Sequence, residues 1–259
     1  MKFERLKEIE NILKLNGSVS VNDLSTRFGV SKETIRKDLD YLSSKKKIGR
    51  VHGGAYSFEY NKSVPFHARD KMLVDEKKEI SSLAAEIIKD GDTIFVDSST
   101  TSVTVVKKLL SDGKKIKVIT NSLACADIAL KNDNIDLYTI GGSLNKSNIS
   151  FETQNSELYN FYNADYAVIS PSGIDIKCGV TDKSDCSSKM LRVFISRAKH
   201  TLIVADHSKL NSVSTFAVSP LCNIDGIITD KIIDKESWVN ASHKDSFFIK
   251  EIETVDKKD

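Results

Sequence analysis

The chain of 259 residues lacks the features of disulfide frameworks, metal centres and membrane proteins. Its four cysteines are scattered without the paired spacing of a zinc site, and its five histidines are equally dispersed. It contains no run of about 18 apolar residues, so we expect no membrane span. The segment from Met1 to Glu8 has the pattern of a charged amphipathic helix and not of a signal peptide. We therefore expect a cytoplasmic protein without a metal or cofactor.

Length and charge indicate two domains of different character. Hydrophobic residues make up 40% of the chain, which is enough for a sizeable core. Residues 1–55 contain 12 Lys and Arg against 7 Asp and Glu, whereas the whole chain has a net charge of only +2. A basic head on a mildly acidic body is typical of a DNA-binding module joined to a domain that does not bind DNA. We predict a head over residues 1–56, a linker over 57–74 and a larger domain over 75–259.

The head has the pattern of a helix-turn-helix followed by a basic hairpin. Gly29 stands where a first helix would end, and Ser31 can cap the next helix. The second helix would bury Ile35 and Leu39 and direct its cationic side chains outward, as a recognition helix does in the major groove of DNA. The apolar residues that can share one small core are Leu24, Phe28, Val30, Ile35, Leu39 and Leu42. The residues expected to contact double-stranded operator DNA are Ser31, Lys32, Thr34, Arg36, Lys37, Lys45, Lys46, Lys47, Arg50 and His52.

Beyond the linker, short apolar runs alternate with helical patterns. Strands are expected at 93–96, 116–119, 135–140, 166–169, 202–205 and 224–228. Helices are expected at 74–89, up to 110, up to 130, near 156–162 and at 184–198, with a loop over 173–179. This order predicts an α/β fold in which the larger domain has a mostly parallel sheet covered on both faces.

Polar or glycine-rich motifs follow three of the predicted strands. Ligands of open parallel sheets bind at the carboxyl ends of the strands. Ser98 to Ser102 lies where a strand turns into a helix, and its hydroxyls and the positive helix end suit a phosphate. Thr120 to Ser122 repeats this arrangement, and Gly141-Gly142 lets backbone approach a ligand. Helix capping is the alternative role of such hydroxyls, but three motifs on one edge favour a binding site.

Three charged residues of the larger domain are further candidates. Lys189 and Lys209 can neutralise an anionic ligand, and Asp175 can accept hydrogen bonds from sugar hydroxyls. The alternative for each is a surface ion pair. His207 is expected to be a capping or surface residue, because no partnered nucleophile is visible.

The motifs of the head are Val30-Ser31, Thr34-Ile35-Arg36, Asp38-Leu39, Leu42 and His52-Gly53-Gly54-Ala55. Those of the larger domain are Asp97-Ser-Ser-Thr-Thr101, Thr120-Asn-Ser-Leu123, Gly141-Gly142, Gly173-Ile-Asp175, Gly179-Val-Thr181, Lys189 and Asp206-His-Ser-Lys209. On these residues nearly the full chain resembles the DeoR family of bacterial transcriptional regulators. The resemblance implies a winged helix-turn-helix head and a sensor domain similar to sugar-phosphate isomerases. The implied effector-binding residues are Asp97, Ser98, Ser99, Thr100, Thr101, Thr120, Asn121, Ser122, Gly141, Gly142, Gly173, Asp175, Gly179, Lys189 and Lys209.

The chain departs from the family pattern at three places. Ser99 and Glu152 stand where the family commonly has glycine, and Lys45 to Lys47 occupies the place of a glycine before the wing. Glu152 also adds a negative charge near the expected phosphate pocket.

The resemblance implies a homo-oligomeric repressor of a sugar-utilisation operon that a phosphorylated sugar releases from DNA. One alternative is a sugar-phosphate isomerase-like enzyme with an accessory DNA-binding head, with Asp97, Asp175 and Lys189 as acid–base residues. Catalysis alone gives no reason for the basic head. A second alternative is an architectural DNA-binding protein, for which the polar strand ends would have no purpose.

Overall fold

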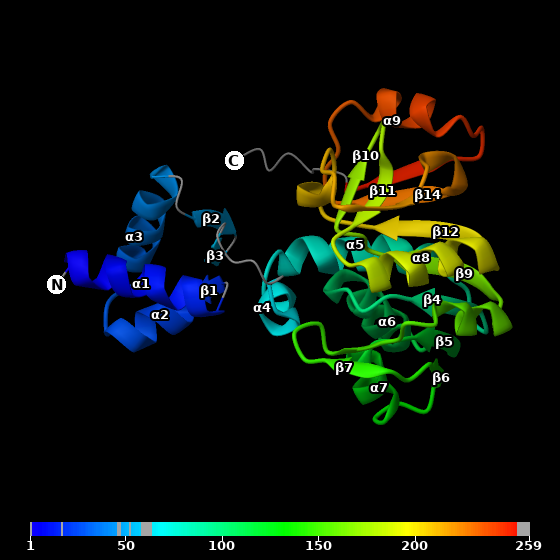
Figure 1. Cartoon of the computed structure of the whole chain (residues 1–259), viewed down its shortest axis with the longest axis horizontal. Helices are drawn as coiled ribbons and strands as arrows, with labels where there is room; N and C mark the ends of the chain where they lie inside the picture. Colours follow the sequence, from blue (N-terminus) through cyan, green and yellow to red (C-terminus); the bar gives the residue numbers. More distant parts are fainter. Residues whose placement is uncertain (1, 17, 46–47, 52, 58–63, 253–259) are drawn as a thin grey trace. The chain divides into compact units, whose positions relative to one another are not determined.

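The computed structural model describes residues 2–16, 18–45, 48–51, 53–57 and 64–252. Contacts divide the chain into two compact units, unit 1 over residues 1–74 and unit 2 over residues 75–259 (Figure 1). Among the described residues, no helix is long and apolar enough to cross a membrane.

Three helices and a small antiparallel sheet make up most of unit 1 (Figure 1). The helices are α1 (Lys2–Asn16), α2 (Val21–Phe28) and α3 (Lys32–Ser44), and the strands are β1 (Ser18–Ser20), β2 (Ile48–Val51) and β3 (Gly54–Ser57) in the order β1-β3-β2. Leu24, Ile35 and Leu39 are buried in one cluster, with Phe28 and Val30 packed against it. This is the small core that the sequence predicts.

The connection between α2 and α3 is a tight turn with a cap on each side. Gly29 has a φ of 61° and its N–H is bonded to the Ser25 carbonyl, which ends α2. A side chain with a Cβ is strained at such a φ, so glycine suits this position. The Ser31 hydroxyl accepts a hydrogen bond from Thr34 N at 3.2 Å and begins α3. The predicted helix-turn-helix is therefore confirmed, and β2 and β3 form the predicted hairpin.

A short helix, α4 (Phe66–Asp70), lies inside the segment for which the sequence predicts only a linker. Pro65 precedes it and its carbonyl accepts from Ala68 N and Arg69 N, while Phe66 is buried. One helical turn is too short to give an apolar periodicity, which is why the pattern does not reveal it.

Unit 2 contains a seven-stranded sheet in which every neighbouring pair is parallel. Its strands, in spatial order, are β15 (Phe248–Glu251), β14 (Gly226–Thr229), β12 (Ala198–Val204), β9 (Ala164–Ile169), β4 (Thr93–Val96), β5 (Ile116–Thr120) and β6 (Ile135–Thr139). The predicted α/β class with a mostly parallel sheet is confirmed.

Both faces of the central strands are buried. On one face, Phe95 of β4 stacks on Phe194 at 4.5 Å between ring centroids, within a cluster that also contains Trp238. On the other face, Ile94 and Val96 are equally buried. The helices around the sheet are α5 (Val74–Ile87), α6 (Thr100–Ser111), α7 (Leu123–Ala129), α8 (Asp185–Arg197) and α9 (Lys235–Ser242) (Figure 1).

Two small antiparallel sheets correct the sequence expectations. The predicted loop at 173–179 is wrong, because β10 (Gly173–Asp175) and β11 (Gly179–Asp182) form a hairpin that pairs with β13 (Phe216–Ser219). A second hairpin, β7 (Ser143–Asn145) and β8 (Ser150–Glu152), was not expected. The helix expected near 156–162 is the 3-10 helix η1 (Ser156–Phe161). Strands of three or four residues carry too few alternations to be recognised by periodicity.

Candidate functional site

The exposed face of α3 carries the cations that the sequence assigns to DNA. Lys32, Arg36 and Lys37 are exposed, whereas Ile35 and Leu39 on the opposite side are fully buried. Arg36 is 3.5 Å from Glu33, and both side chains are more than half exposed, so this ion pair is weak. The guanidinium of Arg36 can therefore exchange Glu33 for a base edge at little cost.

Ser31 and Thr34 are engaged in the cap of α3. Their hydroxyl oxygens are 2.9 Å apart, and Ser31 also caps the Thr34 amide. Their first role is thus to begin the recognition helix. Lys45 lies with its Nζ 5.8 Å from the ring centroid of Tyr41. Arg50 pairs through its backbone with Ala55 in the β2–β3 hairpin, while Lys46, Lys47 and His52 lie outside the described residues.

An ion pair that the sequence analysis missed joins α1 to α3. Arg5 Nε is 2.5 Å from Asp38 Oδ2, and Asp38 is 1% exposed. Asp38 lies three residues after Ile35 and beside Leu39, so helical periodicity places it on the buried stripe of α3. That spacing was the signal for a buried carboxylate in need of a partner.

The strand order of unit 2 places its expected ligand crevice at the carboxyl ends of β4 and β9. From β4 the chain proceeds to β5 and β6 on one side, and then returns to β9 and continues through β12, β14 and β15 on the other. Ligands of open α/β sheets bind where the strand order reverses in this way. Asp97, directly after β4, accepts a hydrogen bond from Ser170 N, directly after β9, at 3.2 Å. The predicted site residues Asp97 and Ser98 therefore lie at this crevice.

Asp97 is an unusual residue for the wall of an anion site. Burial raises its pKa, against hydrogen bonds from Ser102, Ser99 and Ser170 that lower it.

The hydroxyl-rich start of α6 serves two purposes. Ser99 accepts from Ser102 N at 3.1 Å and donates to the Ser102 hydroxyl at 2.9 Å, so it is the helix cap. The Ser99 hydroxyl is therefore engaged with the first turn of α6. Thr100 and Thr101 are buried in the first turn, whose amides have no intrahelical acceptor. The first turn of α6 is the part of this segment that can bind a phosphate.

At the end of β5, too, some polar side chains cap backbone amides, while one has an atom without a hydrogen-bond partner. Thr120 Oγ1 accepts from Ser122 N at 3.0 Å, and the Ser122 hydroxyl accepts from Cys125 N at 3.4 Å to begin α7. Asn121 Nδ2 donates to the Phe151 carbonyl at 3.0 Å, and its Oδ1 has no partner. Of these three residues, only Asn121 has a buried side-chain atom without a hydrogen-bond partner, its Oδ1.

Glycines of the candidate site make close contacts with the chain itself. A Cβ on Gly142 would lie 2.2 Å from the Glu152 carbonyl oxygen, and Gly141 faces open space. Gly173 and Gly179 are similarly close to the backbone of Ser212 and Ser219. The close backbone contacts of Gly142, Gly173 and Gly179 require glycine at these positions whether or not a ligand is bound.

Asp175, Lys189 and Lys209 each have a protein partner. Asp175 Oδ1 accepts from Cys178 N at 2.9 Å and Lys177 N at 2.8 Å, and these bonds lower the pKa of Asp175 while holding the β10–β11 turn. Lys189 is 2.7 Å from Asp185 on the exposed side of α8. Lys209 Nζ donates to the Pro171 carbonyl at 2.9 Å, which places it beside the crevice.

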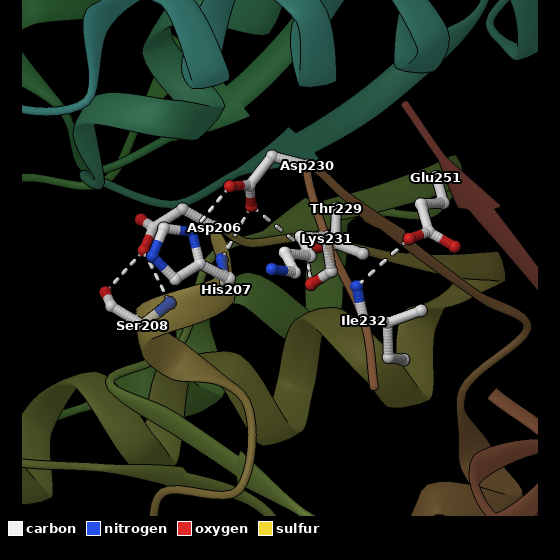
Figure 2. A network of polar contacts seen from close by, with 8 residues as sticks. All are labelled: Asp206, His207, Ser208, Thr229, Asp230, Lys231, Ile232 and Glu251. Carbon is white, nitrogen blue, oxygen red and sulfur yellow. Dashed lines mark hydrogen bonds and ion pairs between the residues drawn. The ribbon is translucent and has the colours of Figure 1, made fainter. Parts of the chain in front are cut away.

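The motif Asp206 to Lys209 is part of a polar network at the carboxyl ends of β12, β14 and β15 (Figure 2). Asp206 caps the 3-10 helix η2 (His207–Lys209) through Ser208 N at 3.1 Å. His207 N is 2.6 Å from Asp230 Oδ1, and its ring Nδ1 is 2.5 Å from Asp230 Oδ2. The network fixes the loop from which Lys209 extends.

A cavity of about 30 Å³ lies beside the crevice, enough for one group of about the size of a water molecule. Its walls come from Ser98, Asn121, Asn148, Ser150, Phe151, Glu152, Thr153, Tyr159, Cys186, Ser187 and Met190. In the described part of the chain, four buried side-chain atoms have no hydrogen-bond partner, namely Asn121 Oδ1, Tyr159 Oη, Ser170 Oγ and Trp238 Nε1. Asn121 and Tyr159 line this cavity, and Ser170 lies at the crevice. Ser170 directly follows a predicted strand and is one of the polar strand-end residues that the sequence indicates, but neither Ser170 nor Tyr159 is among the predicted effector-binding residues.

A helix-turn-helix and an α/β domain with a polar crevice define a DNA-binding regulator with a sensor domain. The DeoR-like helix-turn-helix domain matches residues 5–61, and the DeoR C terminal sensor domain matches residues 73–231. The chain belongs to the DeoR family of transcriptional regulators.

Sequence similarity to known transcriptional regulators extends over nearly the whole length of this chain and of each relative. The chain is 31% identical to the HTH-type transcriptional regulator IolR of Bacillus subtilis, over 91% of this chain and 94% of the relative. It is 34% identical to the HTH-type transcriptional repressor GlcR of B. subtilis, over 88% of each. It is 28% identical to the glycerol-3-phosphate regulon repressor of Escherichia coli, over 88% and 90%. These relatives are regulators, so the chain is a transcriptional regulator and not an enzyme.

A solved structure gives a weaker likeness. Ribose 5-phosphate isomerase A of Methanocaldococcus jannaschii has 17% identity and a TM-score of 0.39, over 53% of this chain and 54% of its own.

Proposed function

We propose that the protein is a repressor that binds operator DNA through α3 and the β2–β3 hairpin and is released by a phosphorylated sugar in unit 2. The DNA-binding part is supported by the exposed cations of α3, which stand on a capped and well-packed helix. A ligand releases the protein only if it favours one arrangement of the DNA-binding heads over the other.

The observation that carries the effector site is the set of unpartnered buried atoms at the carboxyl edge. Buried polar groups are nearly always hydrogen-bonded, and leaving one unpaired costs about 1–3 kcal/mol. Asn121 Oδ1, Ser170 Oγ and Tyr159 Oη all lack a partner near the point where the strand order reverses. A polar ligand would satisfy them.

The phosphate would bind at the start of α6, where Thr100 and Thr101 present first-turn amides, with Lys209 as the nearby cation. This position agrees with the preference of helix N-termini for anions. Lys189 is the less favourable cation, because Asp185 already neutralises it. One relative is the repressor of a glycerol-3-phosphate regulon in E. coli, which is consistent with a phosphorylated effector.

The test uses operator DNA selected from a random pool by the full-length protein. Fluorescence anisotropy then follows release of that DNA by sugar phosphates and by their unphosphorylated parents. We expect phosphorylated members to release the DNA at concentrations at least about tenfold lower, because the parents leave the α6 amides unpaired. Equal action of both members of every pair would refute the phosphate site.

A further inference from the structure

The β7–β8 hairpin is bound to the end of β5 and closes one side of the effector site. Phe151 N donates to the Asn121 carbonyl at 2.9 Å, and Leu123 N donates to the Ile149 carbonyl at 2.9 Å. These bonds place Glu152 and Asn121 in the wall of the same cavity, which we call the Glu152 cavity.

Glu152 is held in this wall by its own hairpin. Its Oε1 accepts from Asn145 Nδ2 at 2.6 Å, and Asn145 Oδ1 accepts from Asn148 N at 3.0 Å. Burial raises the pKa of the Cys186 thiol, and the Glu152 carboxylate raises it further. Because Cys186 belongs to α8 and lines the same cavity, the charge of Glu152 acts across the cavity.

Asn121 contributes a second acceptor whose orientation is fixed. Its Nδ2 donates to the Phe151 carbonyl, so Oδ1 must be the atom that is left without a partner. The Tyr159 hydroxyl, also buried and unpartnered, can accept a hydrogen bond as well. The cavity is therefore rich in acceptors.

The surrounding charges are mainly negative. The Glu152 carboxylate lines the cavity, and Asp185 directly precedes the cavity residue Cys186. The nearby cation Lys189 is paired with Asp185 at 2.7 Å. A phosphate in this cavity would face the Glu152 carboxylate and the Asn121 Oδ1 acceptor, neither of which can donate a hydrogen bond to it. A primary ammonium has three donors, one positive charge and about the volume of a water molecule.

We propose that the Glu152 cavity binds a primary ammonium group, so that the effector is an amino sugar phosphate. The phosphate then lies at the start of α6 and the amino group beside Glu152. This inference rests on the proposed function, because it assumes a phosphorylated sugar in unit 2.

Calorimetry on the full-length protein tests the proposal with matched probes. Glucosamine 6-phosphate, glucose 6-phosphate and N-acetylglucosamine 6-phosphate, together with the galactose series, differ only at the amino position within each series. We expect the amines to bind about 10- to 100-fold more tightly than the hydroxyl forms, as for one charge-assisted hydrogen bond. The N-acetyl forms should bind most weakly, because they lack the charge and exceed the cavity.

Two variants distinguish the local effect of the Glu152 carboxylate on amine binding from the effect of the overall charge of the protein. Glu152→Gln keeps an acceptor for Asn145. It should reduce the ratio of the dissociation constants of the hydroxyl and amine phosphates to nearly one. Glu79→Gln removes the same charge from an exposed position of α5 and should leave this ratio unchanged.

The outcomes also distinguish this proposal from the proposed function. Equal binding of amine and hydroxyl phosphates, or an advantage that persists in Glu152→Gln, would overturn the ammonium site alone; a lone water molecule would then fill the cavity. If no sugar phosphate in the panel binds better than its parent sugar, the proposed function fails and this proposal fails with it.

Discussion

At the scale of single residues, the polar groups at the strand ends of unit 2 fall into two sets. Ser99, Thr120 and Ser122 satisfy backbone amides of their own turns. Ser170 and Asn121 are equally buried but have an atom without a partner. The first set stabilises the fold and the second remains available to a ligand, so substitutions in the two sets should have opposite effects.

Ser170→Ala tests this division. Because the Ser170 hydroxyl has no partner, its removal should leave the free energy of unfolding unchanged or raise it by up to about 1 kcal/mol. Effector affinity should fall about tenfold. Ser99→Ala is the matched control and should lower the free energy of unfolding by about 1 kcal/mol as a lost cap. Urea unfolding and calorimetry give both readouts, and a clear loss of stability in Ser170→Ala would contradict the assignment.

Asp97 should make stability depend on pH in a direction opposite to that of most carboxylates. Its pKa is raised in the folded state from 3.8, so the native state binds more protons than the unfolded state above about pH 4. The free energy of unfolding should therefore fall as the pH rises towards the raised pKa. In Asp97→Asn this slope should vanish. The loss of one accepted hydrogen bond should lower stability by about 1–3 kcal/mol at low pH, and the difference from the wild type should shrink as the pH rises, because the variant has no buried carboxyl group to ionise.

The control for Asp97→Asn is Asp133→Asn, which removes a carboxylate from an exposed loop. Its pH profile should match that of the wild type. A profile of Asp97→Asn with the wild-type slope would show that another group titrates.

Arg36 should contribute to sequence recognition. Arg36→Ala should weaken operator binding by about 1–3 kcal/mol if the guanidinium contacts a base edge. Arg36→Lys keeps the charge but loses the paired donors, so it should lose most of that affinity while retaining the salt dependence. Wild-type operator affinity in both variants, with an intact fold, would exclude Arg36 from recognition.

At the scale of elements, the cap of α3 links stability to DNA binding. Ser31→Ala should lower the free energy of unfolding by about 0.5–2 kcal/mol, because the Thr34 amide loses its acceptor. Ser31→Asp keeps the cap and should retain stability, but its charge should weaken DNA binding. Denaturant unfolding and anisotropy separate the two effects; equal stability of all three proteins would show that the cap is unimportant.

The elements also differ in how far they can be predicted from the sequence. Gly29 and Ser31 identify the helix-turn-helix because turn and cap chemistry depends on neighbouring residues alone. The long apolar runs identify the strands of the parallel sheet for a similar reason. The β7–β8 hairpin was missed because its three-residue strands are held by Asn121, about 30 residues earlier in the chain. For the same reason the sequence could not tell that Asn121 is free while Thr120 and Ser122 are caps, or that Asp175 holds a turn.

At the scale of the whole molecule, we expect unit 2 to hold two or more copies together. A single helix-turn-helix contacts one half-site, and two linked heads gain affinity through effective concentration. The full chain should sediment as at least a dimer at micromolar concentration, with and without DNA. A strict monomer under both conditions would contradict this expectation.

The most direct test of the central claim is release of operator DNA by matched pairs of phosphorylated and parent sugars. Anisotropy of labelled operator with the full-length protein measures the concentration of each compound at half-release. In at least one pair, the phosphorylated member should act at a concentration about tenfold or more below that of its parent. Ser170→Ala should raise this concentration while leaving operator affinity in the absence of effector unchanged. Equal action within every pair, or an unaltered response in Ser170→Ala, would contradict a phosphorylated effector at the carboxyl edge of the sheet.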